Sequence, residues 1–69
     1  MKEFELNGNE FIELNKLLKL LRLVNSGGEA NIMIESEEVY VNSKIETQKR
    51  KKLRSGDIVK FQDSIIKIL

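Results

Sequence analysis

The feature with the clearest chemical potential is a group of cations between positions 44 and 54. Like charges held so close together repel one another, and a phosphate backbone would relieve that repulsion. The same run could also be a solvated loop that only aids solubility, and its composition leaves both interpretations open. The cations are Lys44, Lys49, Arg50, Lys51, Lys52 and Arg54.

A second group of cations follows helical spacing. Lys16, Lys19 and Arg22 stand three residues apart, which places them on one side of a helix beside Asn15. An exposed helix face normally carries charge. However, neither Lys19 nor Arg22 has an acidic residue three or four positions away, whereas a surface shaped only for stability usually mixes the signs. This face is therefore a candidate for binding an anionic partner.

The segment Ser26-Gly27-Gly28 offers a third candidate, at the start of a second predicted helix. Free backbone N–H groups at a helix N-terminus attract anions, and glycine lets a phosphate approach closely. The alternative is an ordinary capping box: Ser26 would accept the N–H of Glu29, and the Glu29 carboxylate would accept the N–H of Ser26. Glu29 would then compete with any bound anion.

The composition excludes most other chemistry. The 69 residues contain neither His nor Cys, so the commonest general base and the thiolate nucleophile are both absent. The carboxylates Glu35, Glu37 and Glu38 lack the spacing of a calcium loop, and no apolar run is long enough to span a membrane. We therefore expect no enzyme, cofactor, metal site, small-molecule substrate or membrane contact. We also expect a cytoplasmic monomer. The side chain of Tyr40 could either stack on a nucleic-acid base or be half-buried in a sheet.

Two helices are predicted in the first half of the chain, after a short strand over residues 2–6. Leu14, Leu17, Leu18 and Leu21 form one apolar stripe at helical spacing. Leu20, Leu23 and Val24 extend the apolar surface, so the end of this helix is expected to be buried on two sides. The second helix should run over residues 27–35 with Ala30, Met33 and Ile34 as its buried stripe.

Four short strands are predicted in the second half, where the apolar period becomes two. They cover residues 39–41, 44–46, 58–61 and 65–69. Asn42-Ser43 should form the first hairpin turn, residues 47–52 a solvated loop, and Gly56 the third position of a type II turn. The whole chain, residues 1–69, is expected to form one α+β domain with two helices packed on a small, mainly antiparallel sheet.

These segments together resemble the alpha-L motif, the RNA-binding domain first recognised in ribosomal protein S4. The matching segments are 14–19, 23–30, 39–42, 46–47 and 52–59, in the same order and spacing. The short chain and the Ser-Gly-Gly-Glu-Ala segment are most similar to the stand-alone bacterial members connected with ribosome maturation. The chain departs from the usual pattern at Glu13 and at Gly27 and Gly28, where many members carry arginine.

The resemblance implies an RNA-binding protein that recognises structured ribosomal RNA and acts in ribosome assembly or translation. The alternative function is a small protein–protein adaptor without direct RNA contact. The RNA contacts that the resemblance implies are Asn15, Lys16, Lys19, Ser26, Gly27, Gly28, Asn31, Asn42, Lys44, Thr47, Lys49, Arg50, Lys51 and Lys52. A ubiquitin-like sulfur carrier is excluded because the chain ends Ile66-Lys67-Ile68-Leu69 and not in two glycines. A DNA-reading second helix is disfavoured because residues 27–35 contain no cation.

Overall fold

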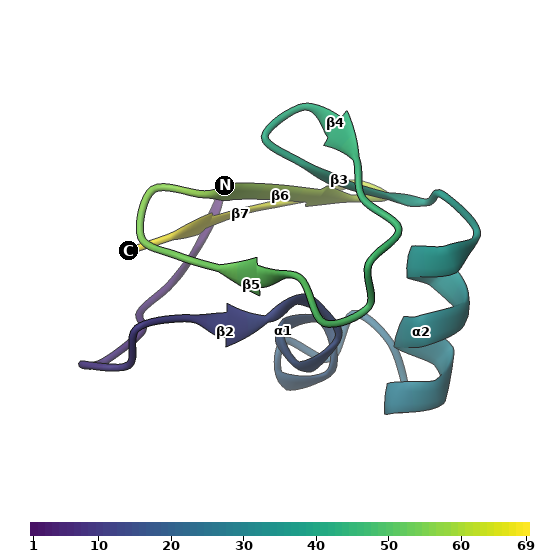
Figure 1. Cartoon of the computed structure of the whole chain (residues 1–69), viewed down its shortest axis with the longest axis horizontal. Helices are drawn as coiled ribbons and strands as arrows, with labels where there is room; N and C mark the ends of the chain where they lie inside the picture. The colour runs from purple at the N-terminus through teal and green to yellow at the C-terminus, as the bar shows by residue number, and fades with distance from the viewer.

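A computed structural model describes residues 1–69 and confirms the predicted α+β class. A five-stranded sheet lies above two helices in the view of Figure 1. The pair β2 and β5 lies below this sheet, with β2 beside α1 and leading directly into it. The elements are β1 (Lys2–Phe4), β2 (Ile12–Glu13), α1 (Leu14–Leu20), α2 (Gly27–Glu35), β3 (Val39–Val41), β4 (Lys44–Ile45), β5 (Lys52–Leu53), β6 (Ile58–Phe61) and β7 (Ser64–Ile68).

The large sheet is mainly antiparallel, as predicted. Its strand order is β1-β7-β6-β3-β4, and only β1 and β7 run parallel. Side chains alternate between its two faces, so that β6 buries Val59 and Phe61 and exposes Ile58 and Lys60. The buried face packs on the leucine stripe of α1 and on α2. Together they form one core cluster, and this core contains no polar side chain.

The turns of the sheet follow the predicted chemistry. Asn42 and Ser43 both adopt the left-handed conformation, with φ of 51° and 71°, as the favoured two-residue hairpin turn requires. Gly56 has a φ of 97°, and the N–H of Asp57 donates to the carbonyl of Arg54 at 3.0 Å. Gly56 therefore occupies the position of a type II turn that requires a positive φ.

Helix α1 is shorter than predicted. It ends at Leu20, and the side chain of Leu20 is 57% exposed, so the expectation that this end is buried on two sides is wrong for Leu20, although Val24 is buried. The N–H of Leu23 donates to the carbonyl of Leu18, and the N–H of Arg22 to that of Lys19, both at 3.0 Å. This pair of bonds is a Schellman motif, which stops the helix one turn early.

Helix α2 has the predicted bounds and a modified form of the predicted cap. The Ser26 hydroxyl accepts the N–H of Glu29 at 3.1 Å, as expected. The Glu29 carboxylate, however, accepts the N–H of Asn25, one residue before the predicted Ser26. Ala30 and Ile34 are fully buried, and Met33 packs against the core from its edge.

Strands β2 and β5 were not predicted. Lys52 was expected in a solvated loop, but it pairs with Glu13, and Leu53 pairs with Ile12. Leu53 is fully buried and Ile12 almost so, which explains why these two segments, far apart in the chain, come together. A strand of two residues has no detectable period, so the pattern of the sequence does not reveal it.

Both helices end on a left-handed residue that is not glycine, and one of these positions gives a stability test. Glu37 has a φ of 65° after α2, a conformation that costs an L-residue roughly 1–2 kcal/mol. We expect Glu37→Gly to raise the free energy of unfolding by about 0.5–1 kcal/mol, after subtracting the extra chain entropy of glycine. Urea unfolding followed by circular dichroism measures it.

The neighbouring residue supplies the control. Glu38 is exposed like Glu37 but has no positive φ, so Glu38→Gly should lower the free energy of unfolding by roughly 0.5–1 kcal/mol. A loss of stability in both variants would contradict the assignment of strain to Glu37.

Candidate nucleic-acid interface

The segment of residues 47–51 between β4 and β5, here called the basic loop, is fixed by its own backbone to the start of α1. The N–H of Leu14 donates to the carbonyl of Lys51 at 2.9 Å, and the N–H of Asn15 to the carbonyl of Lys49 at 3.0 Å. Glu13, at the N-cap position, makes no side-chain cap. The loop carbonyls thus satisfy two of the free N–H groups that every helix start leaves open.

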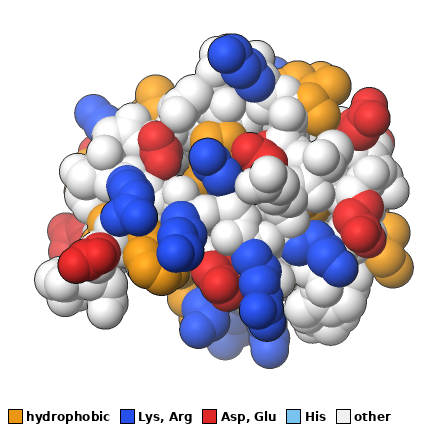
Figure 2. Space-filling model, in the orientation of Figure 1, with side chains coloured by type: hydrophobic (Ala, Val, Ile, Leu, Met, Phe, Trp, Pro, Cys, Tyr) orange, Lys and Arg blue, Asp and Glu red, His pale blue; other side chains and the backbone are white.

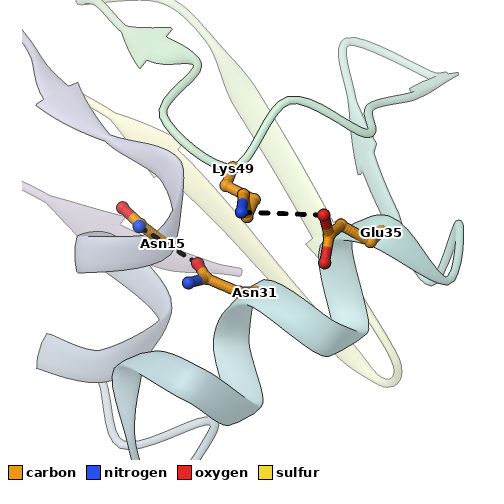
Figure 3. A network of polar contacts seen from close by, with 4 residues as sticks. All are labelled: Asn15, Asn31, Glu35 and Lys49. Atoms are coloured by element: carbon orange, nitrogen blue, oxygen red, sulfur yellow. Dashed lines mark hydrogen bonds and ion pairs between the residues drawn. The ribbon is translucent and has the colours of Figure 1, made fainter.

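Two side-chain contacts join the basic loop, α1 and α2 into one surface (Figure 3). The Asn15 side-chain amide donates to the Oδ1 atom of Asn31 at 3.2 Å, which links the two helices. The Nζ atom of Lys49 lies 3.6 Å from the Glu35 carboxylate, which links the loop to α2. In Figure 3 the side-chain oxygen of Asn15 and the side-chain nitrogen of Asn31 point away from the hydrogen bond between the two residues. Both atoms therefore remain available to a ligand.

A shallow hollow of about 190 Å³ opens where these three segments meet. No hydrophobic side chain lines it; the lining residues are Glu13, Asn15, Lys16, Lys19, Gly27 and Arg50. Figure 2 shows Lys and Arg side chains gathered over β5, the basic loop and α1, with fewer acidic side chains among them. The structure therefore brings together predicted site residues from both helices and the loop.

The start of α2 contributes backbone groups to this hollow. A Cβ atom built on Gly27 would meet no atom within 4 Å, so the backbone there faces open space. The Ser26 hydroxyl is already used by the N–H of Glu29. An anion at this point would therefore meet the N–H groups of Gly27 and Gly28 and not a free serine hydroxyl.

Two of the other predicted residues, Asn42 and Lys44, lie on the hairpin of β3 and β4 and do not line the hollow. Asn42 is occupied within the protein: its Oδ1 atom accepts the N–H of Ile58 at 2.9 Å, and its Nδ2 atom donates to Asp57 at 3.0 Å. Lys44 is paired with Val41 and so lies on the helix-facing side of the sheet edge. Thr47 is exposed in the basic loop.

Phe11 and Arg54 belong to the same surface and were not predicted as contacts. The Nζ atom of Lys52 lies 4.9 Å from the centroid of the Phe11 ring, and the Cζ atom of Arg54 lies 5.6 Å from it. Both distances are within the range of a cation–π contact. The spacing of Lys52 and Arg54 places them on one face of a strand, but their aromatic partner follows only from the pairing of β2 with β5.

No group of three or more Asp or Glu side chains comes together in a way that could hold a metal ion. Neither helix has the length or the apolar composition to cross a membrane.

Comparisons with known proteins agree with this architecture. A model of the S4 domain matches residues 4–69. YbcJ of Escherichia coli is 35% identical over 69 residues, which cover 100% of this chain and 99% of YbcJ. RlbA of Bacillus subtilis, named as a probable ribosome maturation protein, is 36% identical over 53 residues, or 77% of this chain and 75% of RlbA. The solution structure of YbcJ, described as revealing an alpha-L motif involved in RNA binding, matches with a TM-score of 0.75 over 100% of this chain and 87% of that one.

The two side-chain contacts of this surface should differ in their effect on stability. Asn31→Ala leaves the half-buried Asn15 amide without its partner, so we expect a loss of about 1 kcal/mol in the free energy of unfolding. Glu35→Gln breaks an ion pair whose side chains are 46% and 57% exposed, and exposed pairs of this kind contribute less than about 1 kcal/mol. Urea unfolding measures the free energy of unfolding of both variants. A larger loss in Glu35→Gln than in Asn31→Ala would mean that the ion pair holds the basic loop in place.

Proposed function

Because the chain belongs to the S4 domain family, we propose that it is an RNA-binding protein, acting as one domain, that recognises structured ribosomal RNA during ribosome assembly or translation. The hollow between α1, the start of α2 and the basic loop is the observation that supports this most directly. No hydrophobic residue lines it, and its lining includes the cations Lys16, Lys19 and Arg50 beside Gly27 at the start of α2. The relatives support it as well: the motif of YbcJ is described as involved in RNA binding, and RlbA is named as a probable ribosome maturation protein.

The proposed mechanism divides the work between charge and shape. Lys16, Lys19 and Arg50 neutralise phosphates and release their counterions, which supplies affinity without sequence preference. The amides of Asn15 and Asn31 and the N–H of Gly27 fix the position of the backbone. Because the deep groove of A-form RNA is too narrow for side chains to read, recognition rests on shape, on 2′-hydroxyls and on exposed loops.

The other predicted contacts are proposed to extend this surface. Lys44 reaches RNA from the edge of the sheet and Thr47 from the basic loop, and Lys52, beside Phe11, extends the surface toward β2. Asn42 acts by holding the hairpin in place, since its side-chain amide is bonded to Asp57 and Ile58. No hydrophobic residue lines the hollow, which favours RNA over the protein–protein adaptor as its ligand.

The first test is the salt dependence of binding to purified ribosomal RNA. Roughly four to six phosphate contacts predict a slope of about −3 to −5 in a plot of log affinity against log salt. The variant Lys49→Glu/Arg50→Glu/Lys51→Glu should lose binding while keeping its circular dichroism spectrum. A filter-binding or fluorescence-anisotropy titration between about 50 and 200 mM salt measures both effects.

A variant with the same change in net charge provides the control. Lys2→Glu/Lys60→Glu/Lys67→Glu alters three cations of the large sheet and should keep most of the RNA affinity of the unchanged protein. Equal losses in the two variants would show that only net charge matters. No binding at the low salt concentration would contradict the RNA function itself.

The departure from the family pattern at Glu13 gives a second test. Its carboxylate belongs to the lining of the hollow and opposes a phosphate there. Glu13→Gln should therefore tighten RNA binding by roughly fivefold, the equivalent of about 1 kcal/mol between two charges about 4 Å apart in water. Glu38→Gln, exposed outside the hollow, should change the affinity less than twofold in the same titration. Unchanged or weaker binding by Glu13→Gln would place the phosphates elsewhere.

A further inference from the structure

The face of the large sheet turned away from the helices, here called the outer face, is rich in exposed apolar side chains. Of the eight exposed large hydrophobic residues in the chain, four lie on this face: Tyr40, Ile45, Ile58 and Ile65, each between 38% and 48% exposed. The strand register makes them neighbours, because Tyr40 is paired with Ile45 on one side and Lys60 on the other, and Lys60 is paired with Ile65. A hollow of about 380 Å³ on this face is lined by Tyr40, Ser43, Ile58, Lys60 and Ile65.

No other part of the chain covers the outer face. Both helices lie on the opposite side of the sheet (Figure 1). An antiparallel sheet that faces water normally alternates apolar side chains toward the core with polar ones toward the solvent. Single exposed apolar residues need no explanation, but a contiguous group of them marks an interaction site.

The charges on the outer face indicate the chemistry of the partner. Lys60 stands in the middle of the apolar group, between Tyr40 and Ile65, and has no acidic cross-strand neighbour. Lys67 is the cross-strand partner of Ile58 on one side and of Glu3 on the other, so Lys60 is the cation that determines the charge of this group. The only ion pair in the structure joins Lys49 and Glu35, so neither Lys60 nor Lys67 has a carboxylate within 4.0 Å. A surface that combines apolar side chains with carboxylates would complement both features.

A second copy of this chain fits the face poorly. A two-fold interface uses the same patch on both copies, so the central lysines would be brought close to each other in an apolar contact. RNA also fits it poorly, because two lysines among four apolar side chains offer few contacts to phosphates. The features of the face therefore favour a different protein.

We propose that the outer face is a docking surface for a protein partner whose contact patch is apolar and acidic. This site lies on the opposite side of the sheet from the proposed RNA surface, so the chain can hold RNA and the partner at the same time. With four exposed apolar side chains, the patch is small beside the roughly 20–30 residues that each partner contributes to a standard stable interface. The contact is accordingly weak on its own and gains strength when RNA holds both proteins together.

The test uses two synthetic amphipathic helical peptides and the full chain labelled with nitrogen-15. One peptide carries leucine on one face flanked by glutamate, and the other is identical except for lysine in place of glutamate. The acidic peptide should shift the backbone amide signals of Tyr40, Ile45, Lys60 and Ile65, and the basic peptide should not. Lys60→Glu should lower the affinity for the acidic peptide by about tenfold. The same change should allow the basic peptide to bind at these residues.

A control separates this site from the basic loop, which also attracts acidic peptides. Lys49→Glu should leave the signal shifts on the outer face unchanged. The proposal is overturned if the acidic peptide shifts only signals of residues 47–52 or shifts none. It is also overturned if the outer-face signals change with protein concentration alone, which would indicate self-association, or if an RNA oligonucleotide shifts them and the acidic peptide does not.

Discussion

The proposed RNA surface depends on the two hydrogen bonds by which the basic loop caps helix α1. The start of a helix carries a partial positive charge, so cations beside it are unfavourable. The carbonyls of Lys49 and Lys51 offset this at short range by accepting the N–H groups of Asn15 and Leu14, and the cationic side chains are left on the exposed side. Backbone contacts thus hold in place a segment that charge repulsion alone would drive away. Lys16, Lys19 and Arg50 then line a hollow that is open to the solvent, where a phosphate can contact them.

The rest of the fold maintains that arrangement. Burial of Leu53 and Ile12 pairs β5 with β2, which fixes the end of the loop next to the residue that precedes α1. The bond between Asn15 and Asn31 keeps α2 at a set distance from α1, so that the N-terminus of α2 opens into the same hollow. The apolar core holds these parts rigid without contributing to the surface itself, since none of its side chains lines the hollow.

The sequence predicts the features that repeat and misses those that depend on a single distant contact. The leucine stripe of α1, the alternation in β6 and the turns at Asn42 and Gly56 all follow from local patterns, and the structure confirms them. The pairing of Leu53 with Ile12 has no period to detect. The end of α1 at Leu20 depends on a left-handed Arg22, where the rules for helix ends favour glycine. The cap from the loop uses backbone carbonyls, which every residue type possesses, so no residue in the sequence marks it.

The two helices leave one face of the sheet uncovered. Only 15 of the 69 residues are buried, which is what a chain of this length can enclose. Both helices cover one face of the sheet, and none of residues 1–69 covers the other. An uncovered face needs only to be polar to remain stable in water. Because this one carries isoleucine and tyrosine around an unpaired lysine, its composition is better explained by an interaction than by folding, and the fold leaves that interaction free of the RNA surface.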